Sequence, residues 1–210
     1  MKYAITLTLA ISIFACNSPS NNNIVESTVL NTELQDQLQA KQNAVEQKAD
    51  DEKKRVYAQG IKAVEESGVL QQALNTGDKA PNFVLSNAKG KKTSLYQNLK
   101  NGPVVLTWYR GGWCPYCNIT LAQLQKDLPK FTALGARIMA LTPELPDSSI
   151  NTAQKNALKF DVLSDLGNKV AEQYGVVYTL TPDVATRYQE GFGLHEYNGD
   201  KSNKLPLAAT

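Results

Sequence analysis

Residues 104–117 constrain the fold of this chain more than any other segment. Positions 104–109 form a run of β-branched and aromatic residues, which is typical of a buried strand. Two glycines interrupt the run, and the residues after Cys117 place leucines at helical spacing. The pattern therefore predicts a strand, a tight turn and a helix, with Cys114 just before or at the helix N-terminus and Cys117 three residues further on.

Cys114 is predicted to be the more reactive thiol of the pair. At a helix N-terminus, unpaired backbone N–H groups and the positive end of the helix dipole favour a thiolate over a thiol. In such motifs the thiol pKa falls from about 8.5 to roughly 3.5–7.5. Cys117, one turn into the helix and more shielded, can close a disulfide with Cys114. The two residues are therefore the predicted catalytic redox pair.

Three structural interpretations of the pair compete with redox chemistry. A closed zinc site needs four ligands, and besides this pair the chain has one further Cys and a single His. Buried, inert cysteines fit poorly, because two glycines before Cys114 and Pro115 after it suit an exposed turn. A permanent structural disulfide would close too short a loop to contribute much stability. We therefore predict redox function without a metal or cofactor.

The charge balance excludes one broad class of function. The chain has 22 basic and 20 acidic residues, a formal net charge of +2, and no basic block interleaved with aromatic residues. Proteins that bind nucleic acids carry such a basic patch, so no nucleic-acid partner is expected. The 210 residues, of which 42% are hydrophobic, suffice for one globular domain with appendages.

The first fifteen residues have the shape of an export signal. Lys2 precedes an uncharged run over 3–15, which is shorter than the about 20 apolar residues of a membrane-spanning helix. The run ends in Ala15-Cys16, which resembles a bacterial lipoprotein signal whose Cys becomes the lipid-bearing first residue. We expect a signal peptide over 1–15, lipidation of Cys16, and a protein anchored by its lipid in the membrane of a bacterial cell envelope, on the non-cytoplasmic side. A cleaved signal without lipid and a retained short anchor are the alternatives.

Residues 16–75 are predicted to be a linker followed by amphipathic helices. Apolar side chains recur at helical spacing, but the stripe is thin, so the first half is interpreted as a solvated stalk. A helix over 53–66, closed by Ser67-Gly68, is expected to pack on the domain. A coiled-coil partner is the less favoured alternative, because no heptad seam is sustained.

Residues 76–210 are predicted to form the catalytic domain. Pro and Gly residues mark its start, and short apolar runs then alternate with helical patterns. Such alternation is typical of an α/β domain with a mixed central sheet flanked by helices. The expected strands cover 83–85 at a sheet edge, 104–109 at the sheet centre, 137–141, 160–163 and 176–180, and the expected helices cover 118–134, 147–159 and 166–174.

Two motifs connect this domain to a known family. Residues 77–83 read GDKAPNF, and residues 110–117 read RGGWCPYC. Together with the strand between them, they resemble the peroxiredoxin-like branch of the alkyl hydroperoxide reductase/thiol-specific antioxidant (AhpC/TSA) family, from about residue 77 to 210. The resemblance implies a thioredoxin-like fold, here with an N-terminal helical extension. It also implies a thiol that attacks a hydroperoxide or a disulfide, with a thioredoxin-like protein as reductant.

The second motif departs from the family pattern. Typical peroxiredoxins carry Pro and Thr seven and three residues before the peroxidatic Cys. Counted back from Cys114, those places hold Thr107 and Gly111; counted back from Cys117, they hold Arg110 and Cys114. Arg110 is a candidate for the positive charge that a late Arg supplies in the family, and a solvent-facing Arg is the alternative.

The end of the chain also differs from the family pattern. Relatives continue past a Leu-Pro-x-Pro-Ala-Thr stretch into a further strand and helix, whereas this chain stops at 205–210 with Ala208 in place of the second Pro. We therefore expect a C-terminally truncated domain with an open sheet edge and low stability. His195 stands in a loop-like segment without a catalytic partner, and Arg187 and Tyr188 are expected on the surface of a late helix.

Three functions are open on this basis. In a peroxidase, Cys114 attacks the hydroperoxide and becomes a sulfenic acid, which Cys117 resolves to a disulfide. In a thiol–disulfide oxidoreductase, the same pair exchanges with protein cysteines through a mixed disulfide. In the third, a truncated, lipid-anchored domain keeps the motif without activity. The peroxidase, an antioxidant enzyme, is the favoured prediction.

The lipoprotein prediction is tested by changing Cys16→Ser in the full chain expressed in bacteria. The variant should move from the membrane fraction to the soluble fraction, because the acyl chains that anchor the protein can no longer be attached. Cys114→Ser, as the control, should stay with the membranes. Identical fractionation of Cys16→Ser and the parent would show that Cys16 carries no anchor.

Overall fold

The computed structural model describes residues 22–87 and 89–210. The predicted signal peptide over 1–15 and the predicted lipidation of Cys16 lie outside these residues. In the described part of the chain, none of the helices combines the length and the apolar character needed to cross a bilayer.

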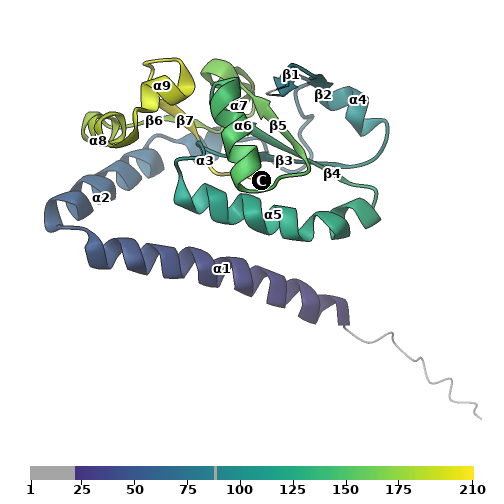
Figure 1. Cartoon of the computed structure of the whole chain (residues 1–210), viewed down its shortest axis with the longest axis horizontal. Helices are drawn as coiled ribbons and strands as arrows, with labels where there is room; N and C mark the ends of the chain where they lie inside the picture. Colours follow the sequence, from purple (N-terminus) through teal and green to yellow (C-terminus); the bar gives the residue numbers. More distant parts are fainter. Residues whose placement is uncertain (1–21, 88) are drawn as a thin grey trace, which may run out of the picture.

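The first helix lies against the domain. α1 (Asn22–Lys48) runs beside α5 (Pro115–Ala133) in Figure 1, and Lys126 of α5 forms an ion pair with Glu33 of α1 at 2.6 Å. Leu38 of α1 is half-buried. This segment is therefore not the free, solvated stalk that its thin apolar stripe predicted.

The second helix packs on the domain as predicted. α2 (Asp51–Glu66) is capped by Asp50, whose carboxylate accepts a hydrogen bond from the Lys53 N–H at 2.7 Å. Val56 is buried in an apolar cluster that includes Leu180 from the C-terminal part of the chain. The apolar face of α2 thus packs against the C-terminal part of the chain.

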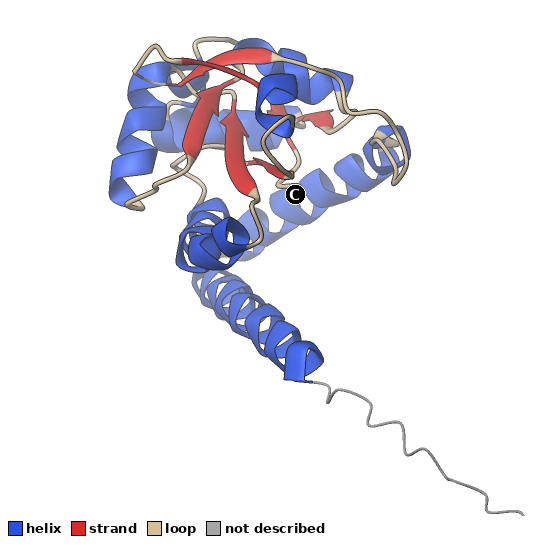
Figure 2. Ribbon diagram, turned by 90° about the vertical axis from the view of Figure 1, so that its right-hand side faces the viewer, coloured by secondary structure: helices blue, strands red, loops and turns tan. Residues whose placement is uncertain are grey.

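The domain is built on a mixed five-stranded sheet in the order β2-β1-β5-β4-β3. β3, β4 and β5 are parallel, and β1 pairs antiparallel with both β2 and β5. Figure 2 shows the strands enclosed by helices, which is the predicted thioredoxin-like α/β arrangement. The strands are β1 (Val84–Asn87), β2 (Lys92–Ser94), β3 (Val104–Trp108), β4 (Arg137–Thr142) and β5 (Asp161–Ser164), and a separate antiparallel pair consists of β6 (Val177–Thr179) and β7 (Lys204–Pro206).

Two predicted strand positions are wrong. β3, expected at the centre of the sheet, is its outer strand, and β1, expected at an edge, lies between β2 and β5. Apolar patterning reports how deeply a strand is buried, whereas neighbour order depends on long-range pairing that the pattern does not encode. The C-terminal residues run beside β3, where the Trp108 N–H donates to the Ala209 carbonyl at 2.8 Å.

The helices follow the predicted order, with one early end. α6 (Pro146–Lys155) begins one residue before the predicted start at 147. It stops before the predicted residue 159, because Ala157 turns the chain with φ at +49°. The predicted helix over 166–174 is a 3₁₀ turn followed by α7. The remaining helices are α3 (Val69–Gln72), α4 (Leu95–Leu99), η1 (Leu166–Asn168), α7 (Lys169–Gln173), α8 (Pro182–Phe192) and α9 (Leu194–Asn198).

The main core packs the sheet against α7. Met139, Leu141 and Leu163 from the middle strands are almost completely buried, and the Trp108 ring of β3 lies 4.8 Å from the Tyr174 ring after α7. This cluster holds β3, and thus the start of the 104–117 segment, against the rest of the domain.

Replacing Leu163→Ala in this core should lower the free energy of unfolding by about 2–5 kcal/mol, because the change removes buried methyl groups and leaves a cavity. Leu134→Ala is the matched control, since Leu134 is 79% exposed; we expect its effect to stay within about 0.5 kcal/mol. Urea unfolding of the full chain measures both. Equal losses would mean that the 163 position is not part of the cooperative core.

Candidate active site

The two thiols lie where β3 leads into α5, as the sequence predicts. Cys114 is the N-cap residue of α5, and its Sγ accepts a hydrogen bond from the Cys117 backbone N–H at 3.3 Å. Pro115 occupies the first helical position, where its missing N–H costs no hydrogen bond. The helix start therefore directs a backbone donor at the Cys114 sulfur.

A network of hydrogen bonds fixes the turn before Cys114. The Gly112 N–H donates to the Glu144 carboxylate at 2.8 Å, and the Asn118 side-chain amide donates to the Gly112 carbonyl, also at 2.8 Å. A side chain at Gly112 would collide with the Thr152 hydroxyl, so glycine is needed for this close approach. The turn is thus held from both sides.

Arg110 lies beside the reactive sulfur. Its Nη2 donates to Cys114 Sγ at 3.1 Å, and its guanidinium group stacks over the Trp113 ring at 5.6 Å. The Cys117 thiol donates to Cys114 Sγ at 2.7 Å. Of the two interpretations of Arg110, this geometry agrees with a charge partner for a thiol and not with a solvent-facing side chain.

These contacts separate the two thiols in acidity. The hydrogen bond from Cys117 and the positive charge of Arg110 lower the pKa of Cys114 to about 6, although burial opposes the shift. The hydrogen bond to Cys114 and burial raise the pKa of Cys117 above its ordinary value. Near neutral pH, Cys114 is therefore a thiolate and Cys117 a protonated thiol, which is the combination that a nucleophile and a resolving residue require.

The expectation of an exposed turn is wrong. Cys114 is 0% exposed and Cys117 is 2% exposed, so neither thiol reaches the surface and Cys117 is not the better shielded of the two. Trp113 and Tyr116 pack with the thiols in one apolar cluster. Glycine and proline predict a turn, but they do not report what lies over it.

Aromatic residues from α8 cover Trp113. The Trp113 ring stacks on Phe192 at 4.3 Å and lies 5.0 Å from the ring of Tyr188. Tyr188 was expected on the surface; it is half-buried here, and burial raises its pKa to about 12. Arg187 is on the solvent side, 3.6 Å from Glu52 of α2. The sequence of α8 predicts a helix, but it does not identify Trp113 as the residue on which the aromatic side chains of this helix pack.

Glu144 is the site residue that sequence reasoning missed. It lies between β4 and α6, is 0% exposed, and accepts hydrogen bonds from Gly112 and from the Thr152 hydroxyl. Burial raises the pKa of Glu144, and the hydrogen bonds it accepts oppose that rise. The available signal was a charged residue placed between two prolines directly after a buried strand.

A small cavity lies beside Cys117. Its volume is about 20 Å³, which is enough for one water-sized molecule. The hydroxyl-bearing residues Thr107, Thr120 and Thr210 are among those that line it, and the Thr107 and Thr210 hydroxyls are 2.9 Å apart. A water-sized space with hydroxyl-bearing residues in its lining therefore adjoins the second thiol.

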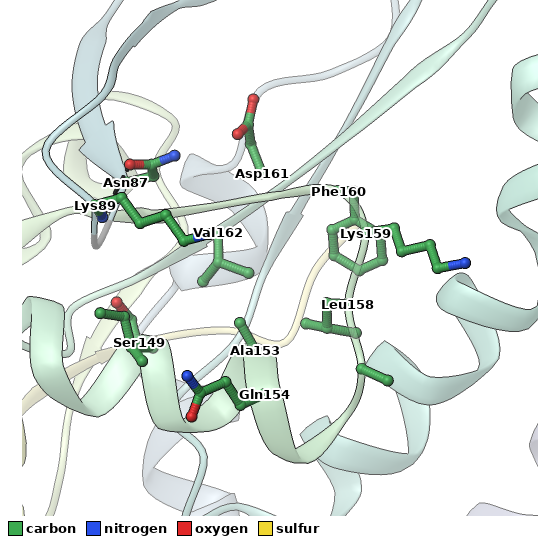
Figure 3. A pocket seen from close by; sticks show the side chains of 12 residues that line it. Asn87, Lys89, Ser149, Ala153, Gln154, Leu158, Lys159, Phe160, Asp161 and Val162 are labelled. Atoms are coloured by element: carbon green, nitrogen blue, oxygen red, sulfur yellow. Dashed lines mark hydrogen bonds between the residues drawn. The ribbon is translucent and has the colours of Figure 1, made fainter.

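A larger cavity of about 490 Å³ is separate from the thiols. Figure 3 shows Ser149, Ala153 and Gln154 of α6 on one side of it and Asn87 and Val162 on the other. Neither thiol lines this cavity, so it is not the redox site. His195, from α9, contacts Asn203 through its ring Nε2 at 2.9 Å and contributes nothing to the thiol pair.

The chain is similar to known redox proteins. The model of the AhpC/TSA family matches residues 76–192. The thiol-disulfide oxidoreductase ResA of Bacillus thuringiensis subsp. konkukian is 28% identical over 135 residues, which cover 64% of this chain and 76% of that protein. The chloroplastic peroxiredoxin Q of Populus jackii is 33% identical over 103 residues, 49% of this chain and 48% of that protein. Among solved structures, peroxidoxin BcpB of Mycobacterium tuberculosis matches with a TM-score of 0.49 and 26% identity, covering 51% of this chain and 70% of that one.

The charge of Arg110 is tested by the variant Arg110→Met. Without the guanidinium group, the pKa of Cys114 should rise from about 6 toward the ordinary value of about 8.5. The pH dependence of Cys114 alkylation, read from the mass of its peptide, measures the shift. Arg137→Met, which removes an arginine from the far end of β4, should leave the pKa of Cys114 unchanged. If Arg110→Met also leaves it unchanged, Arg110 is not the source of the acidity.

Proposed function

Because the chain belongs to the AhpC/TSA family, we propose that it is a thiol-dependent peroxidase that reduces hydroperoxides with Cys114 and Cys117. The observation that carries this choice is an acidic thiol, with a pKa of about 6, that contacts a guanidinium group and has no exposed surface. A hydroperoxide brings two oxygen atoms and one substituent to the sulfur. It therefore needs a far smaller opening than a protein disulfide, whose sulfur is carried on a polypeptide.

In the first step, the Cys114 thiolate attacks the terminal oxygen of the hydroperoxide, which carries the hydrogen. The S–O bond forms as the O–O bond breaks, so Cys114 becomes a sulfenic acid and the substrate leaves as an alkoxide that takes up a proton. Negative charge moves from sulfur to the leaving oxygen. The Arg110 guanidinium group, 3.1 Å from the sulfur, stabilises the negative charge first on the sulfur and then on the leaving oxygen.

In the second step, the Cys117 thiol attacks the sulfenic sulfur of Cys114. A disulfide forms and one water molecule leaves, so two thiols are oxidised for each hydroperoxide reduced. The two sulfurs are already 2.7 Å apart, so this step needs little rearrangement.

A dithiol must then reduce the Cys114–Cys117 disulfide. We propose a thioredoxin-like protein as reductant, because the resemblance of the 110–117 motif to the AhpC/TSA family implies one. Its thiolate attacks one sulfur of the pair and forms a mixed disulfide, and the second thiol of the reductant then releases the reductant as its own disulfide. Both electrons that reached the hydroperoxide are thus replaced. Because both cysteines are buried in the dithiol form, this step requires that the oxidised pair be more accessible than the reduced pair.

Thiol–disulfide exchange with proteins is the second candidate function. The relative named thiol-disulfide oxidoreductase, which matches 64% of this chain, supports it, as does a C-x-x-C pair whose first thiol is acidic. A domain that keeps the motif without activity is the third. Peroxide consumption separates the first function from the second, and cooperative unfolding separates both from the third.

We also propose that the enzyme acts at the non-cytoplasmic side of a bacterial cell envelope, anchored to the membrane by a lipid on Cys16. The support is the N-terminal sequence alone. Fractionation of Cys16→Ser, described above, is its test.

The order of attack is tested with two serine variants in single-turnover oxidation by hydrogen peroxide. Cys117→Ser should react once and stop as a sulfenic acid, which a dimedone probe traps, because the serine hydroxyl can still donate to the thiolate but cannot form a disulfide. Cys114→Ser should react at least about 100-fold more slowly, because the remaining thiol is protonated. The parent chain should lose two thiols per hydroperoxide.

Two results would contradict the predicted order of attack, and they can be told apart. Faster reaction of Cys114→Ser would reverse the two roles. Reaction of both variants at the rate of an ordinary thiol, combined with rapid reduction of a protein disulfide by the parent, would favour the second function.

A further inference from the structure

We propose that Glu144 is a positioning residue of the redox site, which holds the turn at Gly112 so that Arg110 and Cys114 stay in contact. The inference rests on the proposed role of Cys114 as the attacking thiol. Glu144 touches neither sulfur in the contacts described above, and none of the chemical steps uses it. A completely buried carboxylate that takes no part in the chemical steps needs a structural explanation for its position.

The contacts of Glu144 converge on the turn. One carboxylate oxygen accepts from the Gly112 N–H at 2.8 Å, while the other accepts from the Thr152 hydroxyl at 3.3 Å and lies 3.5 Å from the Thr142 hydroxyl. The Tyr109 hydroxyl is close enough for the negative charge of Glu144 to raise the pKa of Tyr109, after the larger effect of burial. Every neighbour named here can donate to the carboxylate, so these groups oppose the rise in the pKa of Glu144 that burial causes.

The position of Gly112 connects these contacts to the thiol. Gly112 lies two residues after Arg110 and two before Cys114, so the orientation of its peptide groups sets how the two side chains meet. On the opposite side, Asn118 donates both to the Gly112 carbonyl and to the Cys114 carbonyl, at 2.8 and 2.9 Å. Asn118 itself accepts from Asn156 at 2.8 Å. Without Glu144, this segment would be held on one side only.

The sign of the effect separates positioning from direct electrostatics. A negative charge near Cys114 disfavours the thiolate, so a purely electrostatic Glu144 would raise the pKa of Cys114, and its removal would lower that pKa. A positioning Glu144 acts the other way. When it is removed, the contact between Arg110 and Cys114 loosens and the pKa of Cys114 rises.

The experiment follows alkylation of Cys114 against pH in the full, reduced chain, with the modified peptide identified by mass. Glu144→Ala should raise the pKa of Cys114 by about one pH unit, which slows alkylation at pH 6 about fivefold. Glu144→Gln should restore the parent behaviour, because its amide oxygen can still accept from the Gly112 N–H. Since alkylation needs no hydroperoxide, this readout is independent of whether the enzyme is a peroxidase.

Asp165→Ala is the matched control. Asp165 is also a buried carboxylate, 2% exposed, that follows a strand and accepts backbone hydrogen bonds, in its case from Val170 and Ala171 at the start of α7. The variant should lower the melting temperature and leave the pKa of Cys114 unchanged. A comparable rise in that pKa with Asp165→Ala would overturn the proposal, because any loosening of the domain would then have the same effect.

Two other results would overturn it. One is a fall, or no change, in the pKa of Cys114 with Glu144→Ala. The other concerns Thr152→Val, which keeps the shape of Thr152 but removes the hydroxyl that donates to Glu144. This variant also tests the proposal if Glu144→Ala does not fold. We expect a smaller rise of the same sign from Thr152→Val, and no rise would count against the proposal.

Discussion

The contact between the Arg110 guanidinium group and the Cys114 sulfur is the interaction on which the site depends. Cys114 has no exposed surface, and a thiolate that is withdrawn from water is stable only beside a compensating charge. Burial acts against the charge of Arg110 as well, but the neighbouring Tyr178 and Cys114 raise the pKa of Arg110. Each of the two charged groups therefore stabilises the other, and loss of either partner leaves an unpaired charge in an enclosed site.

Several parts of the chain hold Arg110 and Cys114 in position. β3 and α5 determine where the turn begins and ends, Glu144 and Asn118 hold the middle of the turn, and α8 covers it. Trp113 links these layers, because one face of its ring meets Arg110 while Phe192 stacks on the ring at 4.3 Å. The enclosure that follows strengthens every electrostatic interaction inside the site, since little water remains to screen it.

Sequence reasoning predicted the local part of this arrangement and missed the long-range part. The strand, turn and helix around Cys114 are determined by residues within a few positions of one another, so their order and the capping role of Cys114 could be predicted. The outer position of β3, the burial of both thiols and the cover by Phe192 depend on pairings across tens of residues. Glu144, 32 positions after Gly112 in the sequence, belongs to the same class. No periodicity links the two residues, and only the folded chain brings them together.

The site also suggests why this chain resembles both a thiol-disulfide oxidoreductase and a peroxiredoxin. The proposed nucleophile, its cation and the proposed resolving thiol all come from residues 110–117, so the acidic thiol is built within a single turn. Both peroxide reduction and disulfide exchange begin from a thiolate. What differs between the two chemistries is the size of the partner that must reach the sulfur. In this chain, Tyr188 and Phe192 of α8, which lie outside the motif, pack on Trp113 within it. On the proposed mechanism, the choice of substrate would depend on this cover, whereas the reactivity of the thiol depends on the turn.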